Sequence, residues 1–162
     1  MFSKTAEYAL RATIYIAQKS TEAKKLGMDE IALSIDAPRS FTAKILQLLT
    51  KDNQVISSVR GVNGGFFITG EARNLTVRRV LEVIGEDAIF RKCVLGLKIC
   101  SETKPCPLHE QYKPIKEGLI RLFESTTIRQ LADGLTSGKS FIAIISTKKQ
   151  GTLPAKSGEK GK

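Results

Sequence analysis

Three cysteines and one histidine lie in a single 17-residue stretch, in the order Cys93, Cys100, Cys106 and His109. They are all the cysteines and the only histidine of the 162-residue chain. Six residues separate the first two cysteines, and five separate the second and third. Thiolates and imidazole are ligands that favour iron–sulfur clusters, zinc or copper(I) over hard cations. The residue types therefore predict a metal centre in this stretch.

The spacing bears on which metal is held. Zinc modules typically carry paired Cys-x-x-Cys knuckles, which are absent here, so the spacing favours an iron–sulfur cluster without excluding zinc. Gly96, Pro105 and Pro107 interrupt any helical or strand pattern and predict a loop. The alternative is three ordinary reduced cysteines on a surface loop. An enzyme is not expected, because no P-loop or Ser-His-Asp order is found and His109 has no nucleophile partner apart from the cysteines.

Composition limits the class of protein and its partners. Hydrophobic residues make up 41% of the chain, which is enough to bury a core. The odd number of cysteines, the lack of an apolar leader and the lack of a long apolar run predict a cytoplasmic protein without a membrane span. The formal net charge is +10, of which the run from Lys148 to Lys162 holds four. The remainder is still basic, which suits a polyanionic partner.

Two short helices joined by a tight turn are predicted over residues 28–49. The apolar positions of the first recur at helical spacing and are Met28, Ile31, Ala32 and Ile35. Pro38 suits the opening turn of the second helix, because its missing N–H has no partner there in any case. The second helix has an apolar face formed by Phe41, Ile45, Leu48 and Leu49. Its opposite face is polar and basic and carries Arg39, Ser40, Thr42, Ala43, Lys44 and Gln47. This is a helix-turn-helix pattern, although two packed helices of a small bundle give the same periodicity.

A β-hairpin is predicted directly after these helices. Residues 55–60 alternate in polarity, a glycine-rich segment follows, and residues 66–69 are aromatic or β-branched. Asn63 and Gly64 are expected to supply the positive φ of the turn. A hairpin after a recognition helix forms the wing of a winged helix, and Arg60 at its edge could enter a minor groove or contact phosphate. Gly61, Gly64 and Gly65 would let the backbone come close to DNA, or serve turn geometry alone.

Further helices are predicted on both sides of this unit. The first spans residues 5–19, with Ser3 or Thr5 as its cap. A later helix follows Thr76 and ends near Gly85. A longer one begins at about residue 110, with an apolar stripe formed by Tyr112, Ile115, Leu119, Leu122 and Phe123. A last short helix begins near Thr127, and the Lys-, Gly- and Ser-rich run after residue 146 predicts a disordered tail.

Several of these segments together resemble the Rrf family of bacterial winged-helix regulators over residues 2–135. The matching segments, in order, are Tyr8–Ala12, Glu30–Ala32, Lys44–Leu49, Ser58–Gly61 and Gly64–Phe66. The resemblance implies a homodimeric repressor or activator that binds a double-stranded DNA operator, and a repressor is the favoured choice. It also implies that the long helix pairs with its twin across the dimer axis. The expected fold is thus mainly α-helical with a small β-hairpin: a winged helix-turn-helix domain (1–75), a linker helix, cysteine loop and dimerisation helix (76–135), and a C-terminal segment with a basic tail (136–162).

The resemblance also bears on the metal centre. The three cysteines point to the cluster-sensing, IscR- and NsrR-like branch, with Cys93, Cys100 and Cys106 as ligands. His109 is the favoured fourth ligand and Glu7 the alternative, and a two-iron two-sulfur cluster is favoured over a four-iron four-sulfur one. The competing hypothesis is a regulator of the same family with a zinc site or a cluster-free thiol sensor. Ala43 stands where some relatives place a base-reading glutamate.

Overall fold

Helix α1 (Lys4–Lys19) lies at the centre of the structure, a computed structural model that describes residues 2–143. Its cap is Ser3, whose hydroxyl accepts a hydrogen bond from the Ala6 amide at 3.1 Å. The buried face of α1 consists largely of alanines, which let the neighbouring helices approach closely. Around it pack α2, α3, α4 and α6, whose bounds follow. The predicted first helix and one of its two candidate caps are thereby confirmed.

Helices α2 (Met28–Ser34) and α3 (Arg39–Leu49) form the predicted helix-turn-helix. In the turn between them the Ala37 amide donates to the Ala32 carbonyl at 3.0 Å. The Arg11 guanidinium of α1 donates to the carbonyl of Ile35, the residue directly after α2, at 3.0 Å. Helix α1 therefore fixes the position from which α3 departs.

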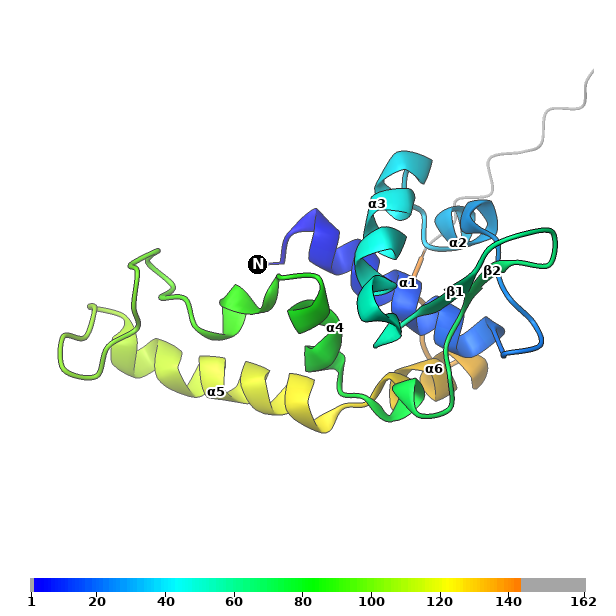
Figure 1. The fold of residues 1–162 in the computed structure, drawn as a ribbon. Helices are drawn as coiled ribbons and strands as arrows, with labels where there is room; N and C mark the ends of the chain where they lie inside the picture. The colour runs from blue at the N-terminus through cyan, green and yellow to red at the C-terminus, as the bar shows by residue number, and fades with distance from the viewer. Residues whose placement is uncertain (1, 144–162) are drawn as a thin grey trace, which may run out of the picture.

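The predicted hairpin is present and consists of strands β1 (Ser57–Val59) and β2 (Gly65–Phe67) in antiparallel pairing. Ser58 lies opposite Phe66 in this register. Phe66 also exchanges two backbone hydrogen bonds of 2.9 Å with Leu26, in the connection between α1 and α2. The wing is thus attached to the helical body along one edge (Figure 1).

The glycines of the wing act differently from the prediction. Asn63 and Gly64 do not supply the positive φ; within this turn it belongs to Gly61 at 106° and Gly65 at 144°. Gly64 is required for another reason, because a Cβ there would lie 2.2 Å from the Val59 carbonyl oxygen. Turn geometry alone accounts for all three glycines, and their proposed contribution to DNA contact stays a prediction.

The second half of the chain forms η2 (Ala72–Asn74), α4 (Val77–Val83), η3 (Asp87–Phe90), α5 (His109–Ser125) and α6 (Ile128–Thr136). Helix α6 begins at a capping box formed by Thr127 and Gln130. Backbone hydrogen bonds join the start of α4 to the start of α6, through Thr76 and Thr127. Helix α5 packs along α4 and runs away from α3 and the hairpin, with the cysteine loop at its far end (Figure 1).

The predicted fold class, mainly helical with one small hairpin in a winged-helix arrangement, is confirmed. The division into residues 1–75, 76–135 and 136–162 stays a prediction, and α6 qualifies it because this helix packs back against α1. Within residues 2–143 no helix is long and apolar enough to cross a membrane. The predicted disordered tail lies outside the described residues.

Candidate metal centre and nucleic-acid interface

The cysteine loop, residues 91–108, connects η3 to α5 without regular secondary structure. Phe90 at the end of η3 is buried and packs edge-on against Phe123 of α5, with ring centroids 5.4 Å apart. Lys116 of α5 donates to the Arg91 carbonyl at 3.0 Å. The start of the loop is therefore anchored to α5 and its end continues directly into α5, while its middle is exposed.

The four predicted ligands lie in two pairs, and the members of each pair are close neighbours. The Sγ atoms of Cys93 and Cys106 are 3.7 Å apart, and Cys100 Sγ lies 3.6 Å from His109 Nδ1. All three cysteines are free thiols. The loop thus brings each predicted ligand next to another one, although the cysteines are separated along the chain.

His109 opens α5 and is only 4% exposed. Its Nε2 is buried without a hydrogen-bond partner, although Glu102 Oε2 lies 3.5 Å away. The carboxylate of Glu102 is paired with Lys113 at 2.8 Å, and this hydrogen bond holds the pKa of Glu102 below its usual value. A buried imidazole nitrogen without a partner is costly, and a bound ligand or metal would satisfy it.

Cys93 lies in an environment that favours its thiolate. A hydrogen bond from the Leu95 backbone lowers the pKa of the Cys93 thiol, and Cys106 and the Lys116 charge act in the same direction. The thiolate is the form that binds metals and reacts as a nucleophile. Cys93 also lines a cleft of about 410 Å³ together with Phe2, at the start of the chain. The chain start, close to α1, is therefore a neighbour of the cysteine loop.

The residue types in this loop, three cysteines and one histidine, are suitable ligands for a soft metal centre. Within the part of the chain that the structure describes, no three cysteine, histidine or acidic side chains are close enough together to hold a metal ion. The two donor pairs nevertheless lie on one loop without helix or strand, and metal binding often completes the folding of such a segment. Thiolates and a neutral imidazole are the donor set that iron–sulfur clusters and zinc use.

Glu7, the alternative fourth ligand, has partners in the first turns of α1. Its carboxylate lies 2.7 Å from Lys4 Nζ and 3.8 Å from an Arg11 guanidinium nitrogen. The hydrogen bond from Lys4 lowers the pKa of Glu7. A ligand role would require Glu7 to leave these pairs, whereas His109 already lies beside Cys100. The choice between them stays a prediction.

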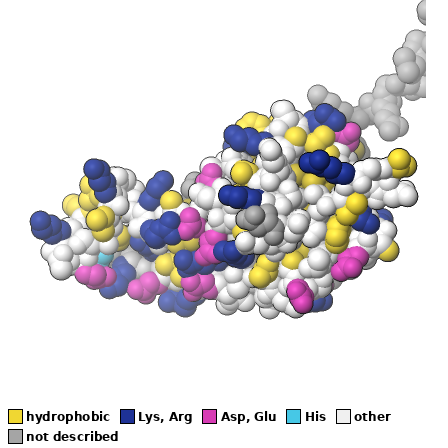
Figure 2. Space-filling model, in the orientation of Figure 1, with side chains coloured by type: hydrophobic (Ala, Val, Ile, Leu, Met, Phe, Trp, Pro, Cys, Tyr) yellow, Lys and Arg dark blue, Asp and Glu magenta, His cyan; other side chains and the backbone are white. Residues whose placement is uncertain are grey.

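The candidate DNA-contacting residues lie on α3 and at the tip of the wing. Exposed positions of α3 include Arg39, Ser40, Lys44 and Gln47, and Arg60 is exposed at the end of β1. Arg39 forms an ion pair with Asp29 of α2. Figure 2 shows Lys and Arg side chains spread over the winged-helix half as well as around the cysteine loop. Exposed basic and polar side chains at these positions suit contact with a phosphate backbone, and the contacts stay predictions.

Thr42, one of the predicted contact residues, lies on the buried face of α3. Thr42 is 0% exposed, and its hydroxyl donates to the Pro38 carbonyl at 3.1 Å. Phe41, predicted to be in the core, is instead exposed, with its ring edge-on to Tyr8 at 6.0 Å between centroids. Leu46 takes the core position. Thr42 is therefore not part of the exposed candidate interface.

Arg60 provides the most direct test of the wing. Changing Arg60 to alanine is expected to weaken operator binding by about 1–3 kcal/mol, the typical loss for an arginine that reads a groove. The fold should not change, because the side chain is exposed and is not part of the core. Gel-shift titration would measure the change, with Arg121→Ala on α5 as the control for loss of one exposed arginine. Equal affinities of the two variants would remove Arg60 from the interface.

Comparison with known proteins supports the sequence resemblance. A family model described as "Rrf2: Iron-dependent Transcriptional regulator" matches residues 2–134. An Aquifex aeolicus protein, named provisionally as an HTH-type transcriptional regulator, is 34% identical over 133 residues, which cover 81% of this chain and 90% of that protein. The HTH-type transcriptional regulator IscR of Escherichia coli is 25% identical over 126 residues, covering 78% of this chain and 76% of IscR.

Solved structures show the same fold. CymR, the global cysteine regulator of Bacillus subtilis, gives a TM-score of 0.66 at 22% identity and covers 82% of this chain and 96% of its own. IscR of T. potens gives a TM-score of 0.60 at 20% identity, with 85% and 88% covered. At these identities the likeness establishes the fold, while the family rests on the sequence match.

Proposed function

This chain belongs to the Rrf2 family of transcriptional regulators, and from that premise we propose that it is a repressor whose operator affinity is set by an iron–sulfur cluster in the cysteine loop. The observation that carries the proposal is the pairing of Cys93 with Cys106 and of Cys100 with His109. Three unrelated surface thiols would not be expected to lie beside one another and beside the only histidine, which is buried. The family description as iron-dependent adds support.

The ligands of such a cluster would be Cys93, Cys100 and Cys106, with His109 preferred as the fourth. Histidine ligation is known for two-iron two-sulfur centres, so we favour that type over a four-iron four-sulfur cluster. When bound, the cluster would supply a redox-active and chemically labile centre. The contribution of the protein is to hold the start of the loop against α5 and to join its end to that helix, so that a change in the loop reaches the helices.

The operator would be read by a homodimer. Ile115 and Leu122 of α5 are 64% and 56% exposed, and seven residues apart they lie on one face of the helix. Leu122 also lines an apolar groove of about 190 Å³ that includes Leu10 and Leu131. Burying these apolar surfaces against a second copy would explain why so long a helix covers so little of its own chain. The two recognition helices would then meet half-sites about 34–36 Å apart.

A cluster-free thiol sensor is the second candidate, and one contact favours it. The Cys93 and Cys106 sulfurs, 3.7 Å apart, need a small movement to reach the disulfide length of about 2.05 Å. Their joining would pass two electrons and two protons to an oxidant. An oxidized form of Staphylococcus aureus CymR is among the solved structures of similar fold. A zinc site on the same residues belongs to this second candidate.

The ultraviolet–visible spectrum of anaerobically purified protein, together with metal analysis, separates these functions. Broad visible absorption with bound iron and sulfide is the expected result. A colourless protein with one bound zinc would support a zinc site. A colourless, metal-free protein whose three titratable thiols decrease on mild oxidation would support the thiol sensor.

The fourth ligand is tested by two single replacements. His109→Ala is expected to shift or bleach the visible spectrum, because the imidazole lies beside Cys100, whereas Glu7→Ala is expected to leave the spectrum unchanged. Spectra of both variants, purified in parallel with the unaltered protein, give the comparison. A shift with Glu7→Ala alone would assign the ligand to α1 instead.

A further inference from the structure

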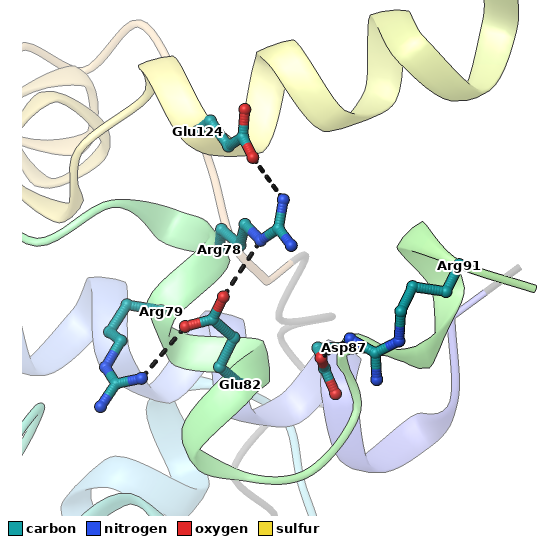
Figure 3. Close-up of polar contacts among 6 residues, drawn as sticks. All are labelled: Arg78, Arg79, Glu82, Asp87, Arg91 and Glu124. Atoms are coloured by element: carbon teal, nitrogen blue, oxygen red, sulfur yellow. Dashed lines mark hydrogen bonds and ion pairs between the residues drawn. The ribbon is translucent and has the colours of Figure 1, made fainter.

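Arg78 of α4 contacts both segments that flank the cysteine loop. Its guanidinium forms an ion pair with Glu124 near the end of α5. The guanidinium carbon also lies 5.0 Å from the centroid of the Phe90 ring in η3, three residues before Cys93. Figure 3 shows Arg78 between α4 and α5. A displacement of either flank of the loop therefore acts on this one side chain.

Glu82 connects Arg78 to the next arginine of α4. Its two carboxylate oxygens accept from Arg78 Nε and from an Arg79 guanidinium nitrogen, each at 3.1 Å (Figure 3). Arg79 in turn donates to the side-chain oxygen of Gln54, which lies 25 residues earlier in the chain. Contacts thus run without interruption from the flanks of the loop through Arg78, Glu82 and Arg79 to Gln54.

Gln54 occupies the short connection between the recognition helix and the wing. It follows η1 (Lys51–Asn53), in which Asn53 has the unfavourable φ of 51°. The next two side chains, Val55 and Ile56, are buried, and the Ile56 amide donates to the Leu49 carbonyl at 3.2 Å. A displacement of Gln54 would therefore change the connection that sets the position of β1 relative to α3.

The partial exposure of these ion pairs agrees with a regulatory role. The side chains of Arg78, Glu82 and Arg79 are 25%, 32% and 40% exposed. Ion pairs at such sites contribute little to folding stability, since water screens them. They can nevertheless select between two positions of neighbouring elements, because each position keeps or breaks a specific contact.

We propose that Arg78, Glu82 and Arg79 are positioning residues that couple the state of the cysteine loop to the recognition helix and wing. This coupling rests on the proposed function, because it requires that the protein is a regulator that binds DNA. It does not depend on whether the cysteines hold a cluster, zinc or nothing. Loss of the Glu82 carboxylate would disconnect Arg78 from Arg79 while leaving the loop and the DNA-contacting residues in place.

Hydrogen exchange on the full chain tests the coupling without DNA or metal. The loop is perturbed by alkylating the reduced cysteines with iodoacetamide, and exchange is followed at residues 53–56, whose Asn53 and Ile56 amides are hydrogen-bonded. In the unaltered protein, alkylation is expected to accelerate this exchange about 5-fold or more, the lower end of typical allosteric coupling. In Glu82→Gln and in Arg79→Gln the change is expected to be less than about 2-fold.

The matched control is Arg121→Gln, which removes an exposed ion pair of α5 outside this path and should keep the response of the unaltered protein. In the double variant of Glu82 and Arg79, the change in exchange on alkylation should be no smaller than in either single variant. The effects of residues in one path are not additive. Either single variant suffices if the other does not fold. An unchanged response in a folded variant, or no response in the unaltered protein, overturns the proposal.

A DNA measurement then separates this inference from the proposed function. The probe is a duplex that this chain selects from a random-sequence library, and its Kd is measured for the reduced and alkylated protein. The ratio of the two Kd values is expected to fall from about 5 or more toward 1 in Glu82→Gln. Failure to select any duplex contradicts the proposed function, whereas a selected duplex with an unchanged Kd ratio contradicts the coupling alone.

Discussion

Replacing Cys106 with alanine is expected to abolish the visible absorption of the anaerobically purified protein, and Cys93→Ala and Cys100→Ala are expected to do the same. Each change removes one thiolate from a set of four ligands that lie in two pairs. Even the loss of a group that only orients a metal ligand lowers metal affinity by about 10–100-fold. Loss of a ligand itself should exceed this, so purified variants should contain little bound iron.

The matched control for these cysteine variants is Ser101→Ala, which changes a side chain of the same loop that points a hydroxyl toward Thr103 at 3.0 Å. It should retain full absorption and iron content. Helical content from circular dichroism should be the same in all four variants, since the loop has no helix to lose. Full colour in two or more of the cysteine variants would contradict the proposed ligand set.

The local elements could be predicted because their signals are local. Helical spacing of apolar residues and the glycine-rich turn placed α1, α2, α3 and the hairpin within a few residues of their observed bounds. Thr42 was misplaced because two stripes on α3 have the right spacing, and hydrophobicity favoured the one with Phe41. In the structure the stripe with Thr42 is the buried one, and the Thr42 hydroxyl donates a hydrogen bond to the Pro38 carbonyl. Which way a helix faces is decided by its neighbours.

Contacts between distant residues could not be predicted in this way. The cysteine loop was recognised by composition, but the pairing of Cys100 with His109 depends on how η3 and α5 anchor the loop. The Arg78–Glu82 pair, four residues apart on a helix, was readable from spacing. The contact of Arg79 with Gln54 joins residues 25 apart and had no signal in the sequence.

Replacing both Ile115 and Leu122 with glutamate is expected to convert the proposed dimer into a monomer. Both side chains are more than half exposed on α5 and would be buried at the proposed interface. Each contributes about 1.5–3 kcal/mol when fully buried, and each occurs twice across a twofold axis. The glutamates would also place like charges opposite each other in an apolar contact. Sedimentation velocity over a range of concentrations would measure the change in mass.

Loss of the dimer should reduce operator affinity more than loss of any single DNA contact. Linking two recognition helices raises affinity by about 10²–10⁴-fold, because the second half-site is bound at high effective concentration. The control is Arg121→Glu, which changes the net charge by the same amount and lies roughly 120° around the helix from Ile115. This control should stay dimeric and bind the operator. A double-glutamate variant that remains dimeric, with unchanged operator affinity, would show that α5 does not form the interface and that the subunits meet on another surface.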